Sequence, residues 1–301
     1  MSRKVTKIDF LGVFPLAVIF SLLLIAGSLY IFFAKGETKY GVDFTGGYEF
    51  LVSAAENGSA DGVRAALNAK GYENAVVQSF EVGSNQYLVR LEGDQTESEA
   101  LKSKVKEIMT SSFGSASDIL RQDFVGPTVG NELRTKALLA VLVALAGILA
   151  FISFRFEFAF ALGAVVALFH DVIISTGIYL LSGQTFSMGA VAAALTIVGY
   201  SVNDTIVIFD RIREELTHRQ KFNLIDVMNE CINLMLSRTL ITHLLTLFSA
   251  AALYFFGGGA ISDLSLYLLA GIIAGSYSTI YIACPVVLMW HKMKGGAIEA
   301  A

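Results

Sequence analysis

Two ionisable side chains interrupt apolar stretches in the C-terminal half of the chain. Asp204 stands within "IVGYSVNDTIVIF" (197–209), and Arg238 begins the next apolar stretch. A carboxylate in hydrocarbon costs roughly 2.5–3.5 kcal/mol on insertion scales, so such groups face a protein interior and commonly mark ion paths or internal pairs. Their opposite charges and similar depth predict an ion pair between Asp204 and Arg238. That pair could serve structure, proton relay or substrate binding.

Polar side chains recur near these charges at helical spacing. Tyr200 precedes Asp204 by four residues and Thr242 follows Arg238 by four, so each pair shares a helix face. Burial favours the protonated carboxyl and a nearby cation favours the ionised one, so helix movement could switch Asp204 between the two. For two candidates in a third apolar stretch, His170 and Asp171, a satisfied polar contact is the plainer interpretation. The secondary candidates are His170, Asp171, Tyr200, Asn203, Thr242 and His243.

The composition of the chain is that of a multi-pass membrane protein. Of its 301 residues, 54% are hydrophobic and 16% are charged, whereas soluble domains carry about 25% charged residues. Apolar stretches of spanning length, about 20 residues, occur at six places. They are residues 10–34, 137–154, 158–181, 187–209, 239–256 and 264–290. The first span is therefore separated from the other five, within 137–290, by one large insertion at 35–135.

The distribution of Lys and Arg in the short connections predicts the orientation. Cytoplasmic loops are enriched in these residues. Here they gather before the first span, between the second and third, between the fourth and fifth, and after the sixth. We therefore expect both termini in the cytoplasm and residues 35–135 outside it. Arg134 and Lys136 are exceptions, but they adjoin the large insertion, where the rule is weak.

The insertion has the pattern of a separate α+β domain. "YGVDFTGGYEFLVSA" alternates like a strand, and "ADGVRAALNAKG" is amphipathic and ends at Gly; two strands, a helix and a last strand follow. The order βαββαβ predicts an extracytoplasmic ferredoxin-like domain. Its acidic surface is either simply solvated or a contact surface for a mobile polypeptide. Gly126-Pro127, where the insertion rejoins the second span, is either a hinge or a stiff turn.

The segment between the fourth and fifth spans, residues 210–238, is too polar to cross the membrane. Its apolar positions recur at helical spacing. This predicts one or two amphipathic helices along the cytoplasmic face, as a packing element rather than a ligand site.

Several function classes are made unfavourable by what the sequence lacks. It has no P-loop, Rossmann glycine pattern, metal-ligand spacing or nucleophile–base constellation, so we predict a protein that is not an enzyme, with no cofactor and no metal. Its net charge of −4 argues against nucleic acid as the partner.

A proton crossing a membrane releases about 2.3 kcal/mol per 100 mV, and about 1.4 kcal/mol per pH unit. That is enough to shift a two-state equilibrium at a carboxylate.

Six motifs in one order give the chain a specific resemblance. They are "GVDFTGG", "DFVGPTVGNEL", "RFEF", "HDVIIS", "GYSVNDTIVIFDRIREEL" and "SRTLIT". Together they closely resemble SecF, the smaller membrane subunit of bacterial SecDF protein-export complexes, in the resistance–nodulation–division superfamily. The resemblance extends from about residue 10 to residue 290.

The resemblance implies a function that periodicity could not supply. Members act in the bacterial inner membrane with SecD, and they use the proton-motive force to pull or hold polypeptide emerging from the SecYEG channel. The family residues implicated in proton passage match Asp204 and Arg238 here. The implied partners are SecD, SecYEG, the translocating polypeptide and membrane lipid, with YajC as a further candidate.

Two alternatives remain open at this point. A small-molecule/proton antiporter of the same superfamily would need a substrate cavity and larger exterior domains. A scaffold that stabilises the export channel without transducing energy would tolerate changes at Asp204 and Arg238. It would be damaged instead at close-packing glycines such as Gly271 and Gly275, in the sixth span.

Overall fold

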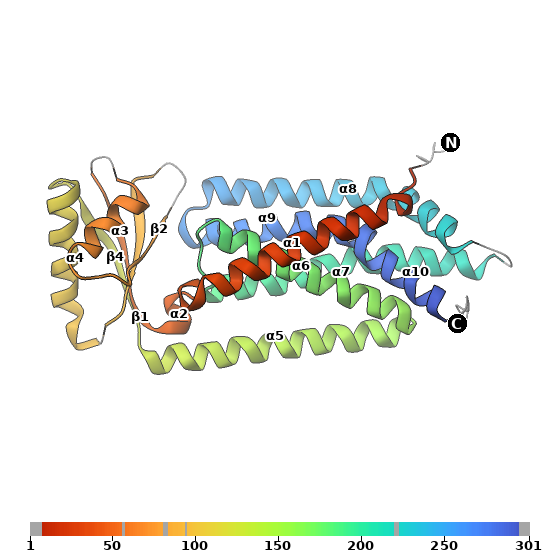
Figure 1. The fold of residues 1–301 in the computed structure, drawn as a ribbon, viewed down its shortest axis with the longest axis horizontal. Helices are drawn as coiled ribbons and strands as arrows, with labels where there is room; N and C mark the ends of the chain where they lie inside the picture. The colour runs from red at the N-terminus through yellow and green to blue at the C-terminus, as the bar shows by residue number, and fades with distance from the viewer. Residues whose placement is uncertain (1–7, 56–57, 81–83, 94, 220–222, 295–301) are drawn as a thin grey trace.

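A computed structural model describes residues 8–55, 58–80, 84–93, 95–219 and 223–294. It shows a bundle of long helices with a small α+β domain at one end (Figure 1). The basic residues before the first span, Arg3, Lys4 and Lys7, lie outside the described residues.

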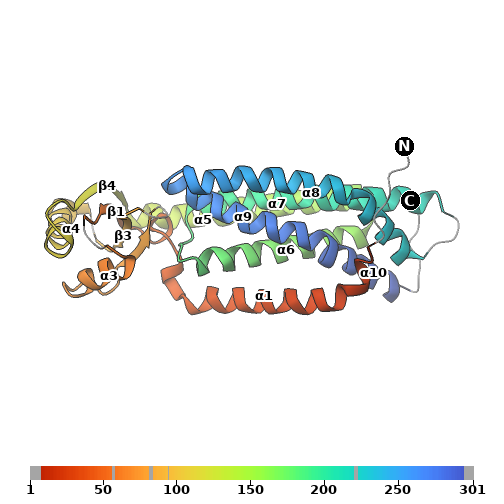
Figure 2. The ribbon, with the colours of Figure 1, turned by 90° about the horizontal axis from the view of Figure 1, so that it is seen from above.

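Six helical segments are long and apolar enough to cross a membrane, as the sequence predicts. In chain order they are α1 (Phe14–Ala34, preceded by the turn Leu11–Val13), α5 (Pro127–Arg155), α6 (Phe158–Leu181), α7 (Met188–Thr217), α8 (Leu224–Phe256) and α9 (Gly259–Ser278). The last continues through a π-helical turn, Thr279–Ala283, into α10 (Cys284–Met293). Two of these helices, α6 and α9, form the centre of the bundle, whereas α5 lies along its outside (Figures 1 and 2).

Local sequence explains where the helices begin and how closely they pack. Ser187 caps α7, because its side chain accepts a hydrogen bond from the Ala190 amide. On α9, a side chain at Gly271 would overlap Ile197 of α7, and one at Gly275 would lie 3.3 Å from Ser201 Cβ. These glycines are therefore used for close packing inside this chain.

The polar segment 210–238 is not a separate element. Residues 210–217 continue α7 without a break, and α8 begins at Leu224 and runs through Arg238 into the apolar stretch. The expectation of distinct amphipathic helices was wrong because nothing in either junction interrupts helical hydrogen bonding. The end of α7 and the start of α8 lie at the end of the bundle away from the small domain (Figure 1).

The small domain is built on a four-stranded antiparallel sheet. Its elements follow one another as β1 (Gly47–Ser53), α3 (Ala60–Asn68), β2 (Val76–Ser79), β3 (Gln86–Leu91), α4 (Ser98–Phe113) and β4 (Asp118–Val125), with the sheet order β2-β3-β1-β4. Alternate residues of β1, Tyr48, Phe50 and Val52, are fully buried against both helices. The burial of this strand face fixes the register of the sheet.

The lead-in between α1 and β1 ties the domain to the start of α7. It contains a short turn, Gly36–Lys39, and the one-turn helix α2 (Val42–Thr45). The amide of Gly41 donates to the Phe186 carbonyl at 2.8 Å, and the Met188 amide donates to Asp43 Oδ2 at 2.8 Å. The loop before α7 is therefore bound by the domain lead-in.

The Gly126-Pro127 junction is short and braced. Gly126 is extended and leads directly into α5. Gly46, with φ +74, lies so close that a side chain there would come within 3.0 Å of Pro127 Cα. No free linker separates β4 from α5, and the hinge role of Gly126 and Pro127 stays a prediction.

Candidate functional site

The intramembrane carboxylate singled out by its sequence lies between α7 and α8. Asp204 Oδ2 is 2.9 Å from Nε2 of His243, and the two side chains are only 12% and 8% exposed. These two atoms are not aligned as a hydrogen bond, and neither has another hydrogen-bond partner among the described residues. His243 Nδ1 lies 2.8 Å from the Thr239 carbonyl, which fixes the ring. Asp204 and His243 thus form a buried pair whose charge depends on protonation.

The expected ion pair between Asp204 and Arg238 is not formed. Arg238 is exposed and, within the described part of the chain, makes no ion pair. The reason is helical register: Arg238 precedes His243 by five residues, about 7.5 Å along the axis of α8. Arg238 remains available to groups outside this chain.

The other polar candidates near Asp204 have different surroundings. The Tyr200 hydroxyl contacts Thr246 Oγ1 at 3.1 Å, and its ring meets His243 edge to face at 5.5 Å. Asn203 and Thr242 are both exposed, and Thr242 bonds to carbonyls of its own helix. Tyr200 therefore belongs to the surroundings of the Asp204 pair, and its hydroxyl also donates to the Thr242 carbonyl at 3.3 Å.

The second carboxylate, Asp171 on α6, is fully buried and fully hydrogen-bonded. Its Oδ1 lies 2.9 Å from His170 Nδ1, and its Oδ2 accepts from Ser201 Oγ at 2.5 Å and Ser278 Oγ at 2.8 Å. With His170 Nδ1 protonated, the carboxylate accepts from three donors. Asp171 thereby joins α6, α7 and α9.

A chain of polar groups extends from His170 to α1. His170 Nε2 is 3.2 Å from Ser21 Oγ, which lies 2.9 Å from the Tyr277 hydroxyl, and Tyr277 donates to the Ala17 carbonyl at 2.5 Å. With both His170 nitrogens protonated, every contact has one donor and one acceptor. His170 and Asp171 were predicted from sequence, but their serine partners were missed because serine is common in membrane helices.

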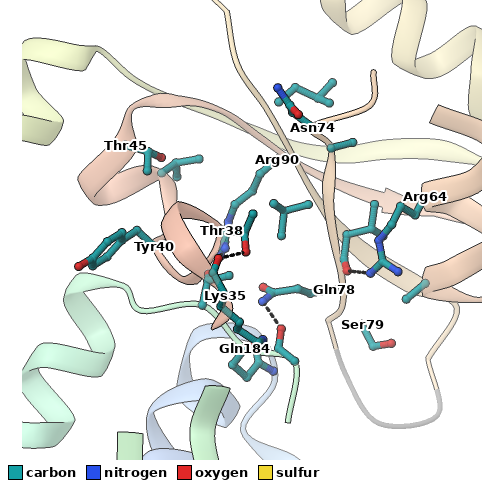
Figure 3. Close-up of a pocket in the computed structure, with 18 of the residues that line it drawn as sticks. Lys35, Thr38, Tyr40, Thr45, Arg64, Asn74, Gln78, Ser79, Arg90 and Gln184 are labelled. Atoms are coloured by element: carbon teal, nitrogen blue, oxygen red, sulfur yellow. Dashed lines mark hydrogen bonds between the residues drawn. The ribbon is translucent and has the colours of Figure 1, made fainter. Parts of the chain in front are cut away.

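A polar cavity of about 940 Å³ lies between the small domain and the membrane helices (Figure 3). Gln78 Nε2 of β2 donates to the Gly183 carbonyl at 2.5 Å, and Arg90 of β3 contacts Thr185. Burial in the cavity wall lowers the pKa of Lys35. Asp204 is not among the residues that line this cavity. A movement of the domain can therefore reach Asp204 through the helices but not through the cavity.

Comparisons with known proteins agree along nearly the whole chain. Residues 104–293 match the family described as protein export membrane protein SecD/SecF, C-terminal. The chain is 40% identical to the protein translocase subunit SecF of Pseudomonas aeruginosa, covering 97% of this chain and 94% of that protein. It is 36% identical to SecDF of Thermus thermophilus, covering 96% of this chain and 39% of that one.

The chain belongs to the SecD/SecF protein-export family. This confirms the resemblance seen in its motifs, and it makes the chain a multi-pass protein of protein transport. It also superposes on the crystal structure of the translocon-associated SecDF from Thermus with a TM-score of 0.85, covering 97% of this chain and 40% of that one. A structure of SecDF in a super-membrane-facing form gives 0.68 over 96% of this chain. In the fused relatives the remaining part includes SecD, which implies a SecD partnership for this chain.

Proposed function

We propose that this chain, with SecD, uses the proton-motive force to drive or complete polypeptide movement through the SecYEG channel. The observation that carries the proposal is the buried contact of 2.9 Å between Asp204 and His243. A carboxylate and an imidazole at this distance can exchange or share a proton, and burial makes their protonation sensitive to neighbouring charges. Protons are the coupling ion, with no metal or organic cofactor.

The geometry of α7 supports coupling between this pair and the exterior domain. Asp204 stands sixteen residues after Met188, about 24 Å along the helix. The start of α7 is tied to the domain lead-in through Asp43, and the preceding loop contacts Gln78. A tilt of α7 on protonation of Asp204 would therefore move the domain, which grips or releases polypeptide in turn.

The partner completes the proton path. Arg238, Asn203 and Thr242 are polar side chains exposed on membrane-spanning helices. Such groups are costly against lipid, so we infer that SecD covers them and supplies the charge that faces Arg238. Both termini are cytoplasmic, and the small domain, which we assign to the ferredoxin-like arrangement, is extracytoplasmic in the bacterial inner membrane. YajC remains a candidate further partner.

The alternatives are less well supported. The glycines expected to mark a scaffold interface, Gly271 and Gly275, pack against α7 of this chain. An antiporter would need a substrate cavity near its proton site. The polar cavity lies instead at the domain junction, where β2 forms part of its lining, and Asp204 does not line it.

The test is protein export into vesicles that contain this chain and SecD, with and without a proton gradient. Asp204→Asn should lose the gradient-dependent fraction and keep the gradient-independent one. Asp210→Asn is the matched control, because Asp210 lies on the same helix but is exposed, where it pairs with Arg155 and Arg213. If Asp204→Asn responds to the gradient as the wild type does, the proposal fails.

A further inference from the structure

An apolar groove runs along the inner side of α5 at the domain end of the bundle. Its volume is about 430 Å³, within the range of about 300–1,000 Å³ typical of small-molecule pockets. The walls come from α5, α6 and α7, with Phe32, Tyr40 and Phe186 at the domain end. Leu138 and Phe169, which also line it, are 61% and 53% exposed, so the groove opens sideways between α5 and α6.

One cation, Arg134, lines the domain end of this groove, and a second, Lys39, contacts two of the lining aromatic rings. The Lys39 ammonium lies 4.3 Å from the centre of the Phe32 ring and 4.9 Å from that of Tyr40. The Arg134 guanidinium carbon lies 4.9 Å from the same Tyr40 ring. Lys39 is only 8% exposed, and neither cation has a carboxylate within ion-pair distance among the described residues. The exposed guanidinium of Arg134, with the Lys39 charge nearby, makes this end of the groove complementary to an anion.

The length of the groove matches one leaflet of a bilayer. From Arg134 to Leu145, the deepest α5 residue of its lining, are eleven residues, about 16 Å of helix. This is about half of a hydrocarbon core of roughly 30 Å. With the inner end of the groove near the middle of the membrane, Arg134 lies at the depth of the head groups.

We propose that this groove binds one phospholipid of the leaflet on the domain side. An acyl chain fills the apolar part between α5 and α6, and the phosphate binds Arg134 at the domain end. Guanidinium and ammonium groups are the usual phosphate partners in proteins. The lipid supplies the packing that α5 lacks, since only 11% of the most apolar window of α5 is buried by the protein. The site is separate from Asp204 and does not depend on proton coupling.

The test uses the full chain with SecD in vesicles of phosphatidylcholine and phosphatidylglycerol. A trace of phosphatidylglycerol carries a photoreactive group near the end of one acyl chain, and labelled residues are mapped by peptide mass spectrometry. We expect saturable labelling at the half-buried groove residues Val172 and Leu195. Val141→Trp, which fills the groove, should abolish it. Val143→Trp is the control, because Val143 is 63% exposed on the same helix and lies outside the groove.

The head-group contact is tested separately. Arg134→Gln should weaken competition by unlabelled phosphatidylglycerol about tenfold, as expected for loss of one charged hydrogen bond. Lys136→Gln should not, since Lys136 pairs with Glu132. Labelling of Val172 and Leu195 that does not saturate, or that survives Val141→Trp, would overturn the proposal. So would a cross-link from the variant Leu138→Cys to SecD, which would make the groove a protein interface.

Discussion

Ser201 donates a hydrogen bond of 2.5 Å to Asp171, although it stands only three residues before Asp204 on α7. One face of α7 thus serves the closed Asp171 network with α6 and α9. A neighbouring face presents Asp204 to His243 on α8. The first carboxylate has three donors, and the second has a contact that is not aligned as a hydrogen bond. We therefore assign a structural role to Asp171 and the proposed proton-dependent switch to Asp204.

His243→Gln should abolish the response to a proton gradient. Removing one partner of a buried charge pair costs about 3–5 kcal/mol, and Asp204 would then lack the imidazole with which it can share a proton. We expect gradient-dependent export to fall at least about tenfold, because each 1.4 kcal/mol is a factor of ten. The measurement is vesicle export with and without the gradient. Thr246→Val is the control, because it removes a contact of Tyr200 and a bond to the Thr242 carbonyl but keeps both Asp204 and His243. A normal response from His243→Gln would show that the imidazole takes no part in the switch.

Asp171→Leu should destabilise the bundle itself. The change leaves the donors of His170, Ser201 and Ser278 buried without an acceptor, and each such group costs about 1–3 kcal/mol. The melting temperature in detergent, followed by the fluorescence of Trp290, should fall clearly below that of the wild type. Asp226→Asn changes an exposed carboxyl in the first turn of α8 and should leave it unchanged. Equal melting temperatures for all three proteins would refute a structural role for Asp171.

Gly271→Ala and Gly147→Ala should change stability in opposite directions. A methyl group at Gly271 overlaps Ile197, and overpacking of this kind costs about 1–3 kcal/mol. Gly147 on α5 has nothing within 4 Å, so alanine there should stabilise the helix by about 0.5–1 kcal/mol. Thermal denaturation of the two variants in the same detergent measures both. The packing account fails if Gly271→Ala is as stable as Gly147→Ala.

A bridge between the small domain and the loop before α7 should stop gradient-driven export. Gln78→Cys and Gln184→Cys place thiols on the two walls of the junction cavity, after the buried Cys231 and Cys284 have been replaced. A cleavable bifunctional thiol reagent would then fix the domain to this loop. Export should be lost on bridging and return on cleavage, whereas each single-cysteine variant should be unaffected. Export that continues at the full rate while bridged would mean that the domain does not move relative to this loop.

The six spans could be predicted from sequence because each is decided by a long run of apolar residues. Asp204 could also be found, since a lone carboxylate in such a run is rare. The partner of Asp204 could not be predicted. Residue spacing shows which side chains share a face of one helix, but it does not show how that helix is aligned against its neighbour. That alignment brings His243 rather than Arg238 to Asp204.

Two further features could not be predicted from the sequence: the partners of Asp171, and the lengths of α7 and α8. Ser201 and Ser278 become recognisable only when three helices bring their hydroxyls to one carboxylate. Polarity marks where a helix leaves the membrane, but it does not end the helix, so residues 210–238 were wrongly separated from the spans. In both cases tertiary contacts and helix continuity carry information that residue types do not.

The wide turn at Thr279–Ala283 changes which side of the last span faces inward. Before it, Gly271, Gly275 and Ser278 are buried at ordinary helical spacing. Continued through positions 282 and 285, this spacing would bury position 289, yet Met289 is 54% exposed and Val287 is buried instead. The π-helical turn therefore shifts the buried face of α10 relative to that of α9. Deleting one residue within it would rotate α10 by about 100° relative to α9. Because the turn starts beside Ser278, which donates to Asp171, the change of face occurs at the level of that carboxylate.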